Sequence, residues 1–193
     1  MDPTARIGPN ALLQLVPVLD RALGVAERVA LFARADVPVP PKDAGMWPEA
    51  EVARLHRTVA QARPDLAPGL LRAAGLATAD YILANRIPRP AKALIRALPG
   101  PLGARLLTAA IGKHAWTFTG SGGFSVEGQR PLTVAITANP LACGTKHAPS
   151  CHWHAAVFER LYATLVWPSV RVTETTCCAC GSVACRFEIG STA

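Results

Sequence analysis

The stretch ETTCCACGSVACRFEIG, from Glu174 to Gly190, decides how this chain ends. Apolar and polar residues alternate on the way into it from Val170, and again from Ala184 to Ile189, which predicts two strands. Gly181 supplies a turn, so we expect the two strands to pair as an antiparallel hairpin. Four of the six cysteines fall within nine residues at this turn. Core packing alone does not explain that density, whereas a hairpin turn is a common place to gather thiolates around a metal.

Zinc suits such a cluster, because it takes four sulfur, nitrogen or oxygen ligands in a tetrahedron. One ligand often comes from a distant segment, and Cys151, at the start of a predicted helix, is placed to supply it. Glu174 lies three residues before Cys177 on the strand that enters the turn. These positions indicate a metal site that joins the helix to the hairpin.

Spacing leaves the ligand set open. The competing donors are Cys177, Cys178, Cys180, Cys185, His152 and His154. Cys177 and Cys178 are adjacent and point to opposite faces of a strand, so we do not expect both to bind one ion. Cys143 is expected to lie outside the site, and free or redox-active thiols are the alternative to any metal.

The composition is that of a folded protein. Half of the 193 residues are apolar, 17% are charged and 6% are aromatic. We see no secretory signal and no apolar run long enough to span a membrane, which predicts a cytoplasmic protein. In a reducing compartment the cysteines are expected to be ligands or free thiols rather than disulfides.

The net charge of +7 is unevenly spread, because no acidic residue lies between Asp80 and Glu127. The basic residues of this interval are Arg86, Arg89, Lys92, Arg96, Arg105 and Lys113. They predict a positive surface for an anionic ligand, an acidic partner or an anionic membrane face, or else a merely solvated basic face. Nucleic acid is disfavoured, since aromatic residues do not interleave with the charges.

The chain is expected to form a single α+β domain, 1–193, with a helical N-terminal part, 1–113, and a strand-helix-hairpin part, 114–193. Helical spacing of apolar residues covers 10–35, 48–63, 68–85 and 91–113, with a proline-rich connector at 37–48. After residue 113 we expect a strand at Trp116 and Phe118, a glycine-rich turn and a second strand at Phe124 and Val126. A third strand at 132–136 and one long helix at 150–166 precede the hairpin.

Three places carry a resemblance to a known family. They are Glu174, Cys177, Gly181 and Cys185-Arg186-Phe187 in the tail, the run Cys151 to Glu159, and Tyr81 to Pro88 with Trp116-Thr117-Phe118. With these residues the chain resembles the 4-vinyl reductase domain family over nearly its whole length, although the tail motif is shared by the whole family.

The resemblance implies a structural zinc ion held by a Cys, Glu, Cys, Cys set, matched here by Cys151, Glu174, Cys177 and Cys185. It also implies a fold like that of a vesicle-tethering subunit family, with helices on one side of an antiparallel sheet. A hydrophobic ligand near the zinc and a homodimer are further implications.

The family's name implies reduction of a vinyl group on divinyl protochlorophyllide, a step of bacteriochlorophyll synthesis for photosynthesis. Such a reaction needs a hydride or electron source. Gly120-Ser121-Gly122-Gly123 lacks the strand-turn-helix context of a dinucleotide site. Glutamate is a poor ligand for an iron–sulfur cluster, and zinc with four protein ligands has neither redox chemistry nor an open position. Catalysis by this chain alone is therefore disfavoured.

A binding role fits better, with a magnesium tetrapyrrole as the ligand implied by the resemblance. Such a disc needs an apolar slot, cations for its carboxylates and an axial ligand. The candidates are Trp116, Phe118, Trp153 and Phe158 for the slot, Arg86 and Arg89 for a propionate, and His114, His152 or His154 for magnesium. Ordinary core packing of the aromatics, a helix-end role for Arg86 and support of the metal site by His152 and His154 are the alternatives.

The leading hypothesis is thus an accessory protein that carries a tetrapyrrole intermediate between bacteriochlorophyll enzymes and supports vinyl reduction. A genuine 4-vinyl reductase that uses an external reductant, and a small-molecule sensor that acts through protein contacts, are the alternatives. Contact with a membrane surface is compatible with the basic interval.

Overall fold

The computed structural model describes residues 4–142 and 149–191. Within them the helices are α1 (Asn10–Leu13), α2 (Leu15–Leu23), α3 (Val25–Ala35), α4 (Glu49–Ala62), α5 (Ala67–Asn85), α6 (Arg89–Ala97), α7 (Gly100–Lys113), α8 (Trp116–Thr119) and α9 (His152–Leu165). The strands are β1 (Arg6–Ile7), β2 (Trp47–Pro48), β3 (Gly123–Gln129), β4 (Leu132–Thr137), β5 (Val170–Thr176) and β6 (Ala184–Ser191), and the 3-10 turn η1 (Cys178–Cys180) joins the last two. Among these helices none is both long and apolar enough to cross a membrane.

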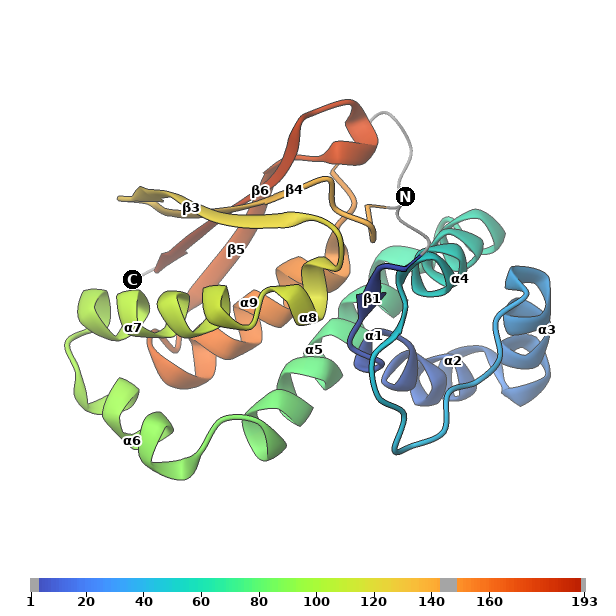
Figure 1. Ribbon diagram of the computed structural model, residues 1–193, viewed down its shortest axis with the longest axis horizontal. Coiled ribbons are helices and arrows are strands. Elements are labelled where there is room, and N and C mark those ends of the chain that lie inside the picture. The colour runs from blue at the N-terminus through green and yellow to red at the C-terminus, as the bar shows by residue number, and fades with distance from the viewer. Residues whose placement is uncertain (1–3, 143–148, 192–193) are drawn as a thin grey trace.

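The main sheet is antiparallel throughout, with strand order β3-β4-β6-β5. Helices α7, α8 and α9 lie against one face of it, while α1 to α4 gather beyond one end of the sheet (Figure 1). This arrangement confirms the α+β prediction and the expected hairpin. The N-terminal segment 10–35 forms three helices, because Gly24, at φ 86°, separates α2 from α3.

The predicted strand at Trp116 and Phe118 is wrong, because these residues form the short helix α8. Alternation of aromatic residues with threonine resembles a strand pattern, but both threonines back-bond to the preceding turn. The Thr117 hydroxyl donates to the His114 carbonyl at 2.7 Å, and the Thr119 hydroxyl donates to the Ala115 carbonyl at 3.0 Å. The change from helix to sheet therefore falls at Gly120.

Helix α5 packs along α9, and this contact positions the start of α9. At Gly75 the two backbones approach so closely that an added Cβ would clash with the Trp153 carbonyl and with the Ala156 side chain. Helix α7 is tied to α9 by a buried hydrogen bond of 2.5 Å between the hydroxyls of Thr108 and Tyr162. Burial raises the pKa of Tyr162 to about 12, so its hydroxyl stays protonated.

The glycine-rich segment after α8 is bound by a buried carboxylate from the helical part. Glu49, in the first turn of α4, accepts hydrogen bonds from the Ser121 amide at 2.5 Å and from the Ser121 hydroxyl at 2.8 Å. Gly120 has φ 57°, and an added Cβ there would collide with the Glu49 carboxylate. This contact joins the N-terminal helices to the beginning of the sheet.

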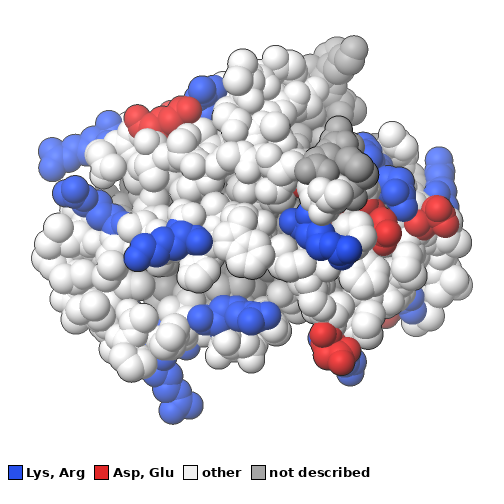
Figure 2. Space-filling model, in the orientation of Figure 1, with Lys and Arg blue, Asp and Glu red and all other residues white. Residues whose placement is uncertain are grey.

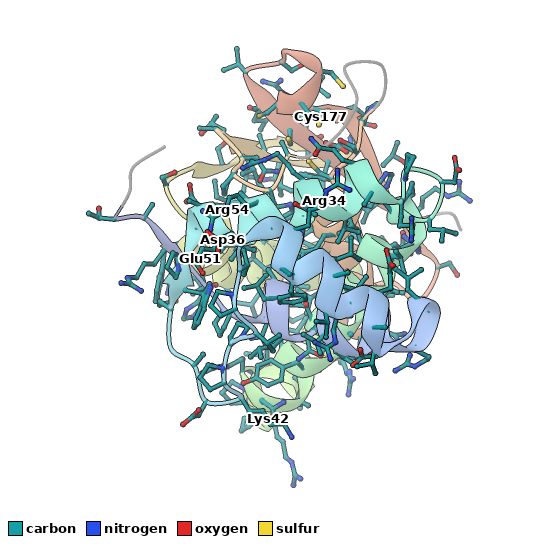
Figure 3. All side chains as sticks on the ribbon, turned by 90° about the vertical axis from the view of Figure 1, so that its right-hand side faces the viewer. Arg34, Asp36, Lys42, Glu51, Arg54 and Cys177 are labelled. Atoms are coloured by element: carbon teal, nitrogen blue, oxygen red, sulfur yellow. The ribbon has the colours of Figure 1, made fainter. Side chains whose placement is uncertain are left out.

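A second polar contact closes the helical part on itself. Arg54 of α4 reaches the C-terminal end of α3, where it donates to the carbonyls of Ala35 at 3.1 Å and Asp36 at 2.9 Å (Figure 3). A cation at this end satisfies carbonyls that have no partner within the helix and opposes the negative end of the helix dipole. Helices α3 and α4 are thereby held in a fixed relation.

Candidate metal centre and the adjoining groove

Four side chains from three elements converge at the hairpin end of the sheet. Cys151 is the N-cap of α9, Glu174 lies on β5, Cys177 directly follows β5, and Cys185 lies on β6. Their ligand atoms all lie within 4.8 Å of one another. Figure 3 places Cys177 at the end of the molecule where sulfur atoms gather, away from the labelled residues of α3 and α4. We call these four residues the metal cluster.

The spacing of the three sulfurs suits a tetrahedral metal. The Cys151 sulfur lies 3.3 Å from that of Cys185 and 3.7 Å from that of Cys177, and the last two are 3.9 Å apart. These thiols are free, since a disulfide would bring two sulfurs to about 2 Å. Zinc–sulfur bonds of about 2.3 Å at tetrahedral angles separate sulfurs by about 3.8 Å, so the cluster has the dimensions of a thiolate zinc site.

Glu174 gives the cluster a carboxylate with one oxygen to spare. Its Oε2 accepts a hydrogen bond from the Cys151 amide at 2.7 Å, which fixes the side chain at the start of α9. Its Oε1 is buried and has no hydrogen-bond partner among the described residues. An unpartnered buried carboxylate oxygen is costly, and a cation among the three sulfurs would satisfy it.

The charges of the cluster are balanced poorly by the protein alone. Burial raises the pKa of Glu174 to about 7. The thiols of Cys151 and Cys185 donate to the Cys177 sulfur and hold the pKa of Cys177 far below its usual range. The same sharing, together with burial, raises the pKa of Cys151 well above its usual value. Four acidic groups thus compete for protons in one small volume, and a bound divalent cation would stabilise all of their anionic forms.

Asn139 supports the cluster and was not anticipated from the sequence, where Asn139-Pro140 only indicates the end of a strand. Its buried side-chain amide donates to the Cys151 sulfur at 3.4 Å, and its carbonyl oxygen accepts from the Leu141 amide at 3.0 Å. The same amide nitrogen lies 3.5 Å from Nδ1 of His154. Support of a metal ligand by a neighbouring hydrogen bond orients the ligand and tunes the ion.

The remaining thiols are not part of the cluster. The Cys178 thiol donates to the backbone carbonyls of Ile136 and Val183 at 3.8 and 3.7 Å, while its own amide donates to the Cys185 sulfur at 3.2 Å. Cys177 and Cys178 therefore face different surroundings, as their adjacency on a strand predicts. Cys143 lies outside the described residues.

A groove of about 690 Å³ opens beside the cluster, between α9 and β5. Its lining is formed by Arg72, Pro149, His152, Ala155, Glu159, Ser169, Val170, Arg171, Val172, Thr173 and Glu174. Because β5 is at the edge of the main sheet, the groove follows an unpaired strand edge. Glu174 belongs to both features, and His152 directly follows Cys151. Metal cluster and groove are thus one continuous site.

The groove combines charges of both signs with apolar wall. Arg72 of α5 forms an ion pair of 2.5 Å with Glu159 of α9, and Arg171 is exposed on β5. Desolvation lowers the pKa of His152, so this half-buried imidazole is neutral near neutral pH. The valines of β5 and Ala155 supply the apolar surface. Neither arginine was singled out in the sequence, because both lie outside its acid-free interval.

The other predicted tetrapyrrole ligands are dispersed and do not line this groove. Arg86 is the C-cap of α5 and lies over the Tyr81 ring at 5.8 Å. Arg89, His114 and Trp116 are exposed on α6, at the end of α7 and on α8. Of all the predicted ligand residues, His152 is the member that the described groove contains.

The remaining aromatic candidates pack in the core. Phe118 contacts Phe124, Phe158 and His154, with ring centroids 5.9 to 6.2 Å apart. His154 is buried, and desolvation lowers its pKa to about 4. Trp153 is buried against His154, and its indole nitrogen has no hydrogen-bond partner among the described residues. The alternative reading of the aromatics as core residues describes their packing.

The fold and the cluster define the class of the protein. The 4-vinyl reductase domain family matches residues 132–191, which include β4, α9, β5, β6 and the whole metal cluster. This match confirms the resemblance that the tail motif indicates.

Two relatives identify the chain more closely. It is 58% identical over 185 residues to the bacteriochlorophyll synthase 23 kDa chain of Cereibacter sphaeroides, an alignment that covers 95% of this chain and 90% of that protein. It is 58% identical over 188 residues to the protein of the same name from Rhodobacter capsulatus, covering 97% of this chain and 88% of that one. The chain belongs to the family of the bacteriochlorophyll synthase 23 kDa chain.

Solved structures with a similar fold include H-NOX proteins. A mutant H-NOX protein from K. algicida, in an unliganded Fe(II) state, matches with a TM-score of 0.66 at 12% identity and covers 97% of each chain. An H-NOX protein from S. oneidensis in the Fe(II)NO ligation state matches with a TM-score of 0.58 at 10% identity, covering 95% of this chain and 98% of that one. At these identities the likeness establishes the shared fold.

Proposed function

We propose that this protein serves bacteriochlorophyll biosynthesis as an accessory protein that binds a magnesium tetrapyrrole intermediate in the groove between α9 and β5. The observation that carries the proposal is the union of groove and metal cluster through His152 and Glu174. A volume of about 690 Å³ falls in the range of about 300–1,000 Å³ that small-molecule sites occupy. The names of the two relatives, bacteriochlorophyll synthase 23 kDa chain, suggest the pathway.

The chemistry of the groove suits a flat pigment with acidic side chains. Arg72 and Arg171 can each meet a propionate carboxylate, for which a guanidinium offers paired donors. Val170, Val172 and Ala155 can contact the ring face. The imidazole of His152 can occupy the axial position of a magnesium ion in the ring. The earlier candidates Arg86, Arg89, His114 and Trp116 have no place in this arrangement.

The metal cluster would hold zinc and brace this site. Three thiolates and one carboxylate are ligands that zinc accepts in a closed tetrahedron, and such a site contributes to folding rather than to chemistry. Cys151 begins the helix that carries His152, and Glu174 lies on the strand that forms the opposite wall. Zinc at this position would therefore fix the width of the groove. Elemental analysis of the purified protein is expected to give one zinc and no iron per chain.

Support of vinyl reduction would then consist of presenting the bound pigment to a pathway enzyme that supplies the electrons. Zinc held by four protein ligands has no redox chemistry and leaves no position for a substrate. Turnover of divinyl protochlorophyllide by the purified chain with NADPH or reduced ferredoxin would replace this proposal with the reductase alternative.

Titration with magnesium protoporphyrin tests the proposal. The wild-type protein is expected to shift the Soret band and quench the pigment's fluorescence at micromolar ligand. His152→Ala should weaken binding about tenfold or more, since an axial ligand is lost, and Arg171→Gln should weaken it less. His114→Ala is the matched control, because His114 is exposed at the end of α7, and it should leave the titration unchanged. No spectral shift with the wild type, or equal effects of the two histidine changes, contradicts the proposed site.

A further inference from the structure

Helix α7 exposes an apolar stripe on a surface rich in cations. Leu102 and Leu106 are 50% and 39% exposed, although they are one helical turn apart in the middle of a folded protein. Positions 102, 106, 109 and 113 recur at helical spacing, so they share one face, while Leu107 and Thr108 are buried on the other. Trp116 of α8 continues the exposed apolar surface with 56% of its area accessible.

Positive charge accompanies this stripe and is not neutralised. Arg105 and Lys113 lie exposed on α7, and α6 adds Arg89. Within the described residues, all five ion pairs involve arginines outside the interval between Asp80 and Glu127. Figure 2 shows Lys and Arg side chains scattered over the half of this face that α6 and α7 occupy, with acidic side chains mostly over the other half. The surface therefore attracts an anionic partner.

We propose that the exposed face of α7, with Leu102, Leu106 and Trp116 between Arg105 and Lys113, docks this protein onto an anionic lipid bilayer. A helix of 14 residues is about 21 Å long and can lie flat in the interface with its apolar side chains in the acyl boundary. Tryptophan is suited to the level of the lipid headgroups, and each nearby Lys or Arg adds about 1 kcal/mol of attraction.

The way α7 is held supports a surface that docks as a rigid body. Its inner face is fixed by Leu107 in the core and by the hydrogen bond between Thr108 and Tyr162 of α9. The stripe is convex helix surface, whereas a partner's side chains would need a groove, and the described grooves lie at α9–β5 and between α2 and α5. The inference goes beyond the pigment site and does not depend on it.

Co-sedimentation of the full chain with vesicles tests the proposal. Wild-type protein is expected to bind vesicles made of equal parts phosphatidylcholine and phosphatidylglycerol, to release them at high salt, and to bind pure phosphatidylcholine at least about tenfold more weakly. Leu102→Glu with Leu106→Glu should weaken binding by about 25-fold or more, because each added charge alone costs about fivefold.

Helix α3 offers the matched control. Val25 and Val29 are also one turn apart and are 58% and 52% exposed, so Val25→Glu with Val29→Glu adds the same charge at equally exposed apolar positions. This pair should change vesicle binding by less than about threefold. Circular dichroism is expected to show wild-type folding for both pairs, since all four positions are at the surface.

A second pair of variants separates charge from apolar contact. Arg105→Gln with Lys113→Gln should weaken binding about 25-fold, whereas Arg34→Gln with Lys42→Gln, at exposed positions of the helical part (Figure 3), should have little effect. Absence of vesicle binding by the wild type, or equal losses in test and control pairs, overturns the proposal. So does a result in which Leu102→Glu with Leu106→Glu only converts a dimer to a monomer in light scattering, because the stripe would then be a contact between copies.

Discussion

The helical part before Gly120 and the hairpin end of the sheet are stabilised in different ways. The helical part buries apolar side chains completely, among them Ile7, Leu12, Leu15, Leu19 and Leu55. The hairpin end buries three thiols and a carboxylate whose second oxygen has no described partner. Apolar packing is spread over many residues, so the loss of one is tolerated, whereas an acidic cluster depends on a single cation. The comparison predicts that the hairpin end fails abruptly and the helical part gradually.

The largest expected effect is at the metal cluster. Cys185→Ser should lose the bound metal and lower the free energy of unfolding by about 4 kcal/mol or more, which lowers the melting temperature by about 10 °C. Cys178→Ser is the control, because its thiol contacts only backbone carbonyls outside the cluster, and it should keep both metal and stability. Metal content and thermal unfolding, with and without a chelator, measure the difference. A Cys185→Ser protein that retains one metal per chain would refute the assigned ligand set.

The junction between the two regions comes next. Gly120→Ala forces a side chain onto a left-handed residue and into the Glu49 carboxylate, so we expect a loss of about 3 kcal/mol. Gly24→Ala is matched in conformation, with φ 86°, but an added Cβ there meets nothing within 4 Å. It should lose only the conformational term of about 1 kcal/mol. Urea unfolding of the two variants separates collision from strain, and equal losses would show that Glu49 does not hold the turn.

How far the sequence predicts these regions depends on the range of the signals. The hairpin, helices α4 to α7 and the cysteine convergence follow from local periodicity and spacing, and each is confirmed as structure. The contacts of Glu49 with Ser121 and of Asn139 with Cys151 and His154 join buried polar residues that carry no local pattern. The groove was missed for the same reason, because Arg72 and Arg171 meet His152 only after α5, α9 and β5 have packed.

The helical part also contains a titratable group that tests its dry packing. Desolvation lowers the pKa of His56 to about 4, while its Nε2 bonds the Ala11 carbonyl at 3.0 Å. A histidine with a depressed folded pKa binds more protons when unfolded, so its stabilising neutral form is lost as pH falls from about 6.5 to 4. Between pH 7 and pH 4.5 this group should remove about 2.5 kcal/mol from the free energy of unfolding.

His56→Gln isolates that contribution, since glutamine can also donate to the Ala11 carbonyl but does not titrate. Urea unfolding at both pH values should show a smaller acid loss in the variant by about 2.5 kcal/mol. The acid responses of His154 and of the metal cluster are common to both proteins and cancel in the difference. Parallel pH curves would mean that water reaches His56 and that the helical part is less tightly packed than its burial indicates.

The smallest effect is expected at the surface of the contact that joins the two regions. Arg160 of α9 forms an ion pair of 2.9 Å with Asp80 of α5, and the two side chains are 45% and 53% exposed. Asp80→Asn should therefore change the free energy of unfolding by less than about 0.5 kcal/mol, and added salt should erase even that difference. Gly75→Ala, at the buried centre of the same helix pair, should cost at least about 2 kcal/mol, because the two backbones cannot separate without opening the core. If urea unfolding reversed this order, charge rather than close packing would hold α9 and the metal cluster to the helical part.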